Sequence, residues 1–216
     1  MNVNDSKLNN SKQNDLLNDK NENMNKNNII EVLETEESEE ELFIENKNKY
    51  CALHMKAPYF ECDAYDGENI RIKLNDFKNK WIVILFYPLD FTFICPTEIC
   101  GLNDLYDDFK SLNCEVLACL VDSILNHTFF FNKLKSEGGL FPCSIKLMSD
   151  PLRRIATDYG VLITEGINRN QALRATFIID DKQIIKSIDI NDNNVGRNIE
   201  DILRRVKDLQ GIKSEF

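Results

Sequence analysis

Long apolar runs and an excess of basic residues are both missing from this sequence. No stretch near the N-terminus is apolar enough for a signal peptide, and none is long enough to span a membrane. Lys and Arg number 26 against 36 Asp and Glu, which gives a formal net charge of −10. Such a balance leaves no basic stripe of the kind that nucleic-acid binding needs. We therefore expect a protein that stays inside the cell, with no membrane or nucleic-acid partner.

Histidine is also scarce, and the cysteines are odd in number. The sequence has two histidines and seven cysteines, and no Cys/His group has the spacing of zinc ligands. In a chain that remains in a cell, an odd cysteine count argues against a permanent disulfide framework. We expect mostly reduced thiols, no metal site and no bound cofactor. The cysteines are Cys51, Cys62, Cys95, Cys100, Cys114, Cys119 and Cys143.

The N-terminal region differs in composition from the rest of the chain. Residues 1–28 are dominated by Asn, Lys, Asp and Ser, and residues 31–45 are rich in Glu. Such a segment buries too little apolar surface to offset the entropy lost on ordering. We predict a disordered tail over 1–48, with a short acidic helix in 31–45 as the alternative, and one folded domain over 49–216. Because the tail is not Arg-rich and acid-poor like a transit peptide, we expect the cytoplasm, with mitochondria as the alternative.

The remaining sequence alternates between strand and helix patterns. Continuous apolar runs predict buried strands, and apolar residues at helical spacing predict amphipathic helices. Short βα connections place the first strands in parallel, and a hairpin and a helix follow. This order predicts an α/β domain with a central mixed sheet flanked by helices, as in the thioredoxin-like fold. The predicted strands are 81–86, 116–121, 147–149, 175–179 and 183–190, and the predicted helices are 95–110, 124–134 (closed by Gly138 and Gly139), 153–159 and 195–209.

Cys95 is the strongest candidate for a reactive residue. It follows the strand that ends at Phe86 and opens a predicted helix, with Pro96 just inside that helix. The free N–H groups of a first helical turn, together with the helix dipole, favour a thiolate over a thiol. A Cys-Pro pair taken alone nevertheless fits a buried, unreactive cysteine better, because free cysteines are among the most buried residues. The surrounding motif is therefore decisive.

That motif is FYPLDFTFICPTE, residues 86–98, and it contains Pro88, Thr92 and Cys95 in the pattern P-x-x-x-T-x-x-C. The sequence resembles the peroxiredoxins, in particular the typical two-cysteine and alkyl hydroperoxide reductase group. Further matching stretches extend the resemblance over roughly residues 53–210; they are LNCEVLACLVDS, MSDPLRRIATDYGVL, RATFIIDD and VGR. The thioredoxin-like fold expected from the strand and helix pattern is also the fold of this family.

The resemblance implies roles for particular residues. Thr92 would hold and polarise the peroxide, and Pro88 would shield the pocket from water. Arg174 would stabilise the thiolate and the charge that develops on the peroxide oxygens. Glu98 resembles the family glutamate that pairs with a second arginine, for which Arg197 is the candidate. Without the motif, Arg174 and Arg197 would be interpreted as ordinary surface ion-pair residues.

The resemblance also implies a reaction and partners. Cys95 would reduce hydrogen peroxide and organic hydroperoxides through a sulfenic acid, and thioredoxin or a similar dithiol would restore the thiol. Homodimers would form through the edge strand near 184–190, and rings of dimers are a further possibility of the subgroup. Two other functions stay open: a redox sensor that passes oxidation to partner proteins, and a holdase chaperone formed on over-oxidation.

One feature of the subgroup is absent from these 216 residues, namely the Val-Cys-Pro segment that carries the resolving cysteine. Three explanations stay open: the sequence is cut short, an external thiol resolves Cys95, or another internal cysteine does so. None of the internal candidates is convincing. Cys100 follows five residues after Cys95 and should point elsewhere, whereas Cys143 lies in a loop and is the least buried candidate by pattern. The weaker candidates are Cys51, Cys62, Cys114 and Cys119.

Overall fold

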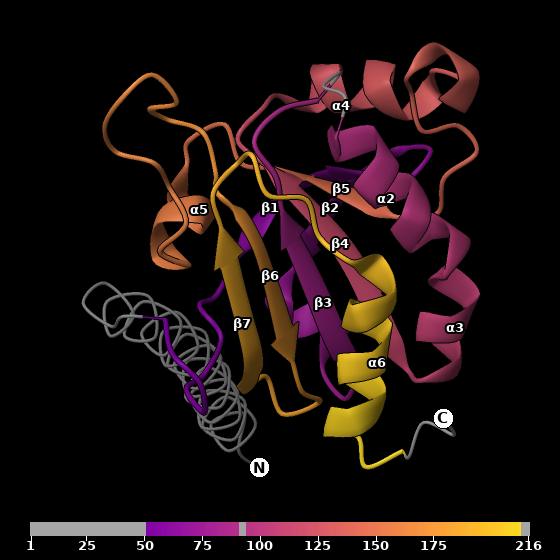
Figure 1. The fold of residues 1–216 in the computed structure, drawn as a ribbon, viewed down its shortest axis with the longest axis vertical. Coiled ribbons are helices and arrows are strands. Elements are labelled where there is room, and N and C mark those ends of the chain that lie inside the picture. The colour runs from indigo at the N-terminus through magenta and orange to yellow at the C-terminus, as the bar shows by residue number, and fades with distance from the viewer. Residues whose placement is uncertain (1–50, 91–93, 213–216) are drawn as a thin grey trace, which may run out of the picture. The chain divides into compact units, whose positions relative to one another are not determined.

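The computed structural model describes residues 51–90 and 94–212 of the chain. The predicted tail over 1–48 and Thr92 lie outside the described residues. The described part forms a seven-stranded sheet in the order β2-β1-β5-β4-β3-β6-β7, with helices on both faces (Figure 1). The strands are β1 (Glu61–Tyr65), β2 (Asn69–Lys73), β3 (Trp81–Phe86), β4 (Cys114–Leu120), β5 (Lys146–Ser149), β6 (Arg174–Ile179) and β7 (Ile185–Asn191). The helices are α2 (Ile94–Asp104), α3 (Tyr106–Ser111), α4 (Ile124–Asn132), α5 (Arg154–Asp158) and α6 (Ile199–Leu209), with 3₁₀ helices at Leu74–Phe77 and Lys135–Glu137.

The sheet is mixed, as the sequence predicts. β3 pairs in parallel with β4 and antiparallel with β6, and β4 pairs in parallel with β5. β3 consists of the apolar run WIVILF, and the side chains of 82–86 are fully buried because helices cover both faces of the central strands. The predicted strand 81–86 is confirmed. It ends at Phe86, and the segment that follows it leads to Cys95.

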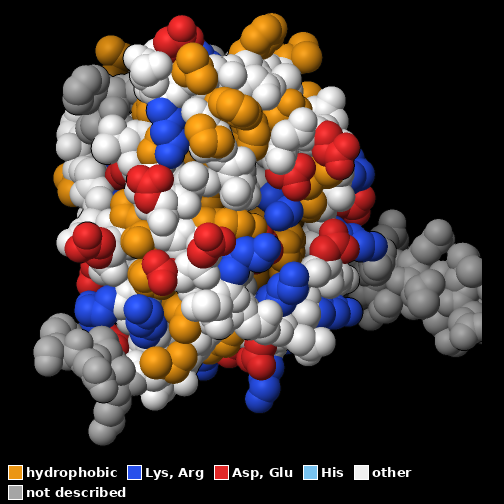
Figure 2. All heavy atoms as spheres, turned by 90° about the vertical axis from the view of Figure 1, so that its right-hand side faces the viewer, with side chains coloured by type: hydrophobic (Ala, Val, Ile, Leu, Met, Phe, Trp, Pro, Cys, Tyr) orange, Lys and Arg blue, Asp and Glu red, His pale blue; other side chains and the backbone are white. Residues whose placement is uncertain are grey.

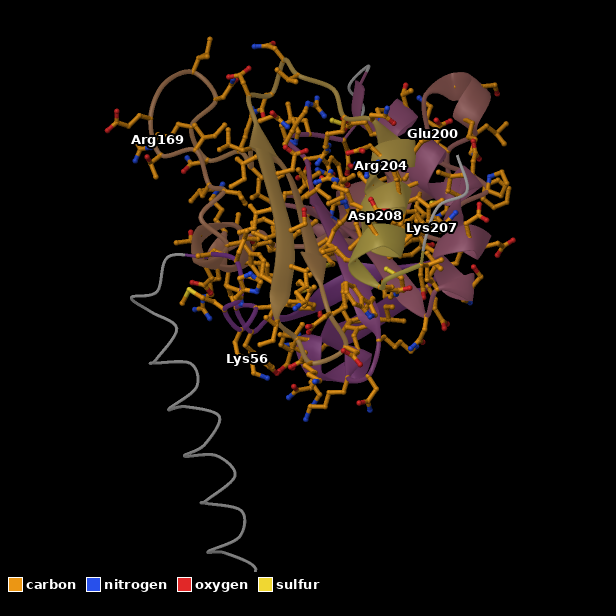
Figure 3. All side chains as sticks on the ribbon, turned by 60° about the horizontal axis from the view of Figure 1, so that its bottom comes forward. Lys56, Arg169, Glu200, Arg204, Lys207 and Asp208 are labelled. Carbon is orange, nitrogen blue, oxygen red and sulfur yellow. The ribbon has the colours of Figure 1, made fainter. Side chains whose placement is uncertain are left out.

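Two layers of apolar side chains cover the two faces of the sheet. One layer packs against α2, α3 and α6, and the other packs against α5 and the segment around Phe60 and Phe77. α6 buries Ile202, Leu203 and Val206 in the first layer. Its outer side carries charged residues instead, as Figure 3 shows for Glu200, Arg204, Lys207 and Asp208. The right-hand side of the molecule in Figure 1 has apolar patches among acidic and basic side chains (Figure 2).

Gly101 sets the distance between α2 and α6. A Cβ atom at this position would lie 3.3 Å from Cγ1 of Ile199, the first residue of α6. That separation is tighter than ordinary van der Waals contact, so a larger residue would require the Ile199 side chain to shift by a few tenths of an ångström. Gly101 thus marks a close contact between α2, the helix that carries Cys95, and α6.

Several element boundaries differ from those predicted. The helix predicted over 95–110 is wrong as one unit: it divides at Leu105, whose dihedrals (φ −98°, ψ 8°) leave the helical range. α4 ends at Asn132 because Lys133 is extended (φ −76°, ψ 140°), so Gly138 terminates the following 3₁₀ turn instead, at φ 83°. α6 begins four residues later than predicted, at a cap where the Asn198 side chain accepts a hydrogen bond from the Asp201 N–H.

The hairpin β1–β2 was not predicted from the sequence at all. It pairs antiparallel in the register Glu61↔Lys73 to Tyr65↔Asn69 and extends one edge of the sheet. No helix within the described ranges is long and apolar enough to cross a membrane.

Candidate active site

Cys95 lies in the first turn of α2, which follows β3 after a connecting segment. Its side chain is fully buried and packs in the same apolar layer as Val83, Leu85 and Ile99. Pro88, in the segment between β3 and α2, is buried as well. The first turn of an α-helix presents free N–H groups and the positive end of the helix dipole, which favour an anion there. Burial by itself disfavours a charged sulfur, so a further source of positive charge is needed.

Arg174 supplies that charge. Its Nη1 donates a hydrogen bond to Cys95 Sγ over 3.4 Å, and its side chain is buried. Arg174 opens β6, and the next residue, Ala175, is paired with Phe86 at the end of β3. This register brings the arginine to the end of the sheet where α2 begins. A guanidinium keeps its charge at any physiological pH, so Cys95 has a permanent cation beside it.

Glu98 forms ion pairs with two arginines, Arg174 and Arg197. It follows Cys95 by three residues and therefore lies on the same side of the helix. Its Oε2 accepts hydrogen bonds from Arg174 Nη1 at 2.9 Å and from Arg197 Nη2 at 2.7 Å. Its Oε1 accepts from the backbone N–H of Arg197 at 2.9 Å and from Nε at 3.2 Å. The structure thus brings the sequence-derived pair Glu98 and Arg197 together with Arg174.

The charges in this cluster do not cancel. Two buried guanidiniums face one buried carboxylate, which leaves one positive charge without an ionic partner within the cluster. An uncompensated charge in a buried site is costly, and a nearby anion relieves the cost. Among the residues that the structure describes, Cys95 Sγ is the other hydrogen-bond partner of Arg174 that can become an anion. The cluster is therefore complementary to a Cys95 thiolate.

Arg197 also donates hydrogen bonds to backbone carbonyls at the ends of two strands. Its Nη1 donates to the carbonyl oxygen of Phe86 at 2.8 Å and to that of Ala175 at 2.9 Å. The buried guanidinium thereby joins β3 and β6 while it also holds Glu98. Through Glu98 it fixes Arg174, so its effect on Cys95 is indirect. The geometry is that of a positioning residue.

A buried polar network behind this segment was missed by sequence reasoning. Asp90 accepts a hydrogen bond from the Tyr87 hydroxyl at 3.0 Å and lies 2.9 Å from Nδ1 of His127. The other ring nitrogen of His127 lies 3.1 Å from the carbonyl oxygen of Met148. The network ties the segment after β3 to α4 and β5. His127 is one of only two histidines in the sequence, which could have drawn attention to it, but nothing in the sequence showed which residue its side chain would contact.

The other six cysteines have a different environment. Burial raises the pKa of Cys51, Cys62 and Cys114 to about 12 and that of Cys143 to about 11. Burial also raises the pKa of Cys100 and of Cys119. A thiol with a raised pKa is a poor nucleophile near neutral pH. Its place in the first turn of α2 and its hydrogen bond from Arg174 therefore single out Cys95 as the candidate reactive thiol.

These raised values predict a loss of stability at alkaline pH. In the unfolded chain a cysteine loses its proton near pH ~8.5, whereas the folded protein keeps Cys51, Cys62 and Cys114 protonated until about 12. The stabilisation is thus fully present below pH ~8.5 and is lost as the pH rises toward the folded-state pKa. We expect the free energy of unfolding, measured by urea titration, to fall steadily above pH ~9. A constant or rising value between pH 9 and 11 would contradict this expectation.

Comparison with known proteins agrees with this geometry. The model of the AhpC/TSA family matches residues 53–188. Human Peroxiredoxin-4 is 46% identical over 155 residues, which cover 71% of this chain and 56% of the human protein. Peroxiredoxin-2 of Macaca fascicularis is 47% identical over 156 residues, which cover 71% of this chain and 77% of that protein. The chain thus spans little more than half the length of its human relative.

Solved structures extend the likeness to the fold. The reduced 2-Cys peroxiredoxin of Plasmodium vivax has a TM-score of 0.69 at 33% identity, over 74% of this chain and 82% of that one. AhpC of Enterococcus faecalis has a TM-score of 0.69 at 34% identity, over 76% and 95% of the two chains. The predicted thioredoxin-like fold is confirmed by these likenesses. Because the family match extends over more than half of its residues, the chain belongs to the AhpC/TSA family, the family of the peroxiredoxins.

Proposed function

We propose that the protein is a thiol peroxidase in which Cys95 reduces hydroperoxides. The contact between Arg174 Nη1 and Cys95 Sγ, in a cluster with one excess positive charge, carries this proposal. A thiolate is the species that attacks a peroxide oxygen, and the cluster favours it. The names of the relatives, which include a thioredoxin-dependent peroxide reductase of mouse, support the same chemistry.

In the proposed first half-reaction, the Cys95 thiolate attacks one oxygen of the hydroperoxide. An S–O bond forms as the O–O bond breaks, and the departing oxygen takes up a proton to leave as water or an alcohol. Sulfur is oxidised to a sulfenic acid and the peroxide is reduced by two electrons. The Arg174 guanidinium stabilises the charge that develops on the oxygens. Glu98 and Arg197 position Arg174, Pro88 excludes water, and Thr92 is assigned to hold the peroxide.

In the proposed second half-reaction, a dithiol reductant of the thioredoxin kind resets Cys95. One reductant thiolate attacks the sulfur of the sulfenic acid, which releases water and gives a mixed disulfide. The second reductant thiol then displaces Cys95 as a thiolate, and the reductant leaves as a disulfide. The mouse relative named thioredoxin-dependent, 44% identical over 165 residues, supports this choice of reductant. That relative is described as mitochondrial, which supports the mitochondrial alternative to a cytoplasmic location.

We further propose that the protein forms a homodimer through β7. This strand lies at the edge of the sheet, and within the described residues its outer side is covered only near Ile185, which exchanges backbone hydrogen bonds with His54 and Met55. Beyond that point, toward Asn191, the outer backbone groups are available to pair with a second copy. Ile190 on this stretch is 43% exposed. Rings of such dimers are a further step that light scattering or native mass spectrometry would reveal.

The peroxidase proposal is tested by trapping the oxidised sulfur. Fully reduced protein is mixed with one equivalent of hydrogen peroxide in the presence of dimedone, which reacts with sulfenic acids, and is then mapped by mass spectrometry. The expected result is consumption of one peroxide per chain with the adduct at Cys95. The proposal fails if peroxide is not consumed or if another cysteine is modified first. Turnover with thioredoxin, thioredoxin reductase and NADPH then tests the reductant separately.

A further inference from the structure

Two cysteines outside the proposed active site, Cys100 and Cys143, lie on segments that Asn103 joins by hydrogen bonds. Cys100 belongs to the second turn of α2, and Cys143 lies in the loop between the 3₁₀ helix Lys135–Glu137 and β5. Both are partly buried and pack against the same apolar layer of the core. In the proposed peroxidase cycle neither of them is needed.

Asn103 holds the loop of Cys143 against the helix of Cys100. Its Oδ1 accepts a hydrogen bond from the backbone N–H of Ser144 at 2.6 Å, and its Nδ2 donates to the carbonyl oxygen of Pro142 at 3.4 Å. The two contacts bracket Cys143 on both sides. Because Asn103 follows Cys100 by three residues, the two side chains share one face of α2. The bracketed loop is therefore held against the face that carries the Cys100 thiol.

Electrostatic coupling agrees with this placement. Burial is the main cause of the raised pKa of Cys143, about 11, and a charge on Cys100 raises it further. The Lys135 ammonium lowers the pKa of both thiols. Lys135 itself lies 3.2 Å from Asp104, the last residue of α2. The influence of Cys100 on Cys143 and the influence of Lys135 on both thiols agree with one local cluster.

We propose that Cys100 and Cys143 form a dithiol site that closes to an intramolecular disulfide by exchange with a small-molecule disulfide such as oxidised glutathione. In the first exchange one protein thiolate attacks the small disulfide, breaks its S–S bond and releases one small thiol. In the second exchange the other protein thiolate attacks the mixed disulfide and releases the second small thiol. Two protein thiols are oxidised, one small disulfide is reduced to two thiols, and the two protein protons pass to the departing thiolates.

The disulfide would tie α2 to the loop that precedes β5. The linkage closes a loop between positions 100 and 143, which restricts the unfolded chain and so stabilises the fold. It would also join the helix that begins beside Cys95 to a second part of the structure. The site is distinct from Cys95 in position and in chemistry, since its oxidant is a disulfide and its thiols are protonated near neutral pH.

The test uses the full chain with the substitution Cys95→Ser, so that neither peroxide nor Cys95 takes part. The reduced protein is incubated with oxidised glutathione at pH 8 without denaturant, free thiols are alkylated, and peptides are mapped by mass spectrometry. The expected product links Cys100 to Cys143 while the other cysteines remain alkylated. Its midpoint of thermal unfolding should rise by roughly 5 °C or more. The rate of closure should increase about tenfold per pH unit between pH 7 and 9, as the thiolate fraction grows below a pKa of about 11.

Two further substitutions in this background serve as matched controls. Cys100→Ser and Cys143→Ser should each leave a mixed disulfide with glutathione on the remaining cysteine and no rise in the midpoint. The proposal is overturned if the folded protein keeps both thiols alkylatable, or if mixed disulfides persist on both without the link. Because Cys95 is absent throughout, none of these outcomes depends on whether the protein is a peroxidase.

Discussion

Replacing Cys95 with serine is expected to lower the rate constant for hydroperoxide reduction by at least about 10⁴-fold, on the scale of losses seen when an enzyme's nucleophile is removed. A serine hydroxyl stays protonated in the same environment, so Arg174 no longer faces an anion. The first turn of α2 and the ion pairs of Glu98 are unaffected by the change. The loss should therefore appear in the chemical step and not in folding. Rapid mixing of excess reduced protein with peroxide measures it directly.

Cys51→Ser is the matched control for this variant. Cys51 is partly buried, burial raises its pKa to about 12, and it lies outside the Arg174 cluster. We expect its rate constant to stay within about twofold of the unsubstituted protein, because a protonated thiol contributes little to nucleophilic attack. If Cys95→Ser kept most of the rate and Cys51→Ser lost it, the assignment of the nucleophile would be wrong.

The second large effect is expected for Arg174→Met, which should reduce the same rate constant by about 10²–10³-fold. The substitution removes the cation that contacts Cys95 Sγ but keeps a side chain of similar length in the buried position. Glu98 retains its contacts with Arg197, so the fold keeps its main buried ion pair. The remaining pair is neutral, and the excess positive charge that favours the thiolate is gone. Alkylation of Cys95 by iodoacetamide at pH 7 should slow in parallel.

Two companion variants separate charge from geometry at this position. Arg174→Lys keeps the charge but cannot reach Cys95, Glu98 and the Asn193 carbonyl together, so we expect an intermediate rate. Arg204→Met removes an exposed arginine of α6 and should leave both peroxide reduction and alkylation unchanged. A normal alkylation rate in Arg174→Met would show that Arg174 does not stabilise the thiolate.

The central strands of the fold could be predicted because their sequences are simple. The run WIVILF is short and apolar with β-branched residues, which favours a buried strand, and all of its residues except Trp81 are buried. The hairpin β1–β2 could not be recognised in the same way. Its outward side carries Glu61, Asp63 and Arg71, which pair with each other across the strands. Such a polar edge gives a weak apolar pattern, and only the contact of β1 with β5, far along the chain, assigns it to the sheet.

The candidate site divides in a similar way. Cys95 and Pro88 are recognisable because they belong to one short motif. Arg174 is distant in sequence, and its position beside Cys95 follows from the pairing of β6 with β3, which a local pattern does not contain. Asp90 and His127 show the same limit, since 37 positions separate two side chains that meet in the core. A local motif identifies Cys95 as the candidate nucleophile, whereas long-range strand pairing determines which side chains surround it.

The excess positive charge around Glu98 has a consequence for each oxidation state of Cys95. A thiolate makes the buried site electrically neutral, whereas the proposed sulfenic acid is uncharged and leaves Arg174 unbalanced. Further oxidation to a sulfinate would restore the negative charge. The site is therefore electrically neutral when Cys95 is a thiolate or a sulfinate, and it carries one excess positive charge when Cys95 is a sulfenic acid. On this basis the site stabilises the proposed sulfenic acid less well than it stabilises the thiolate or the sulfinate.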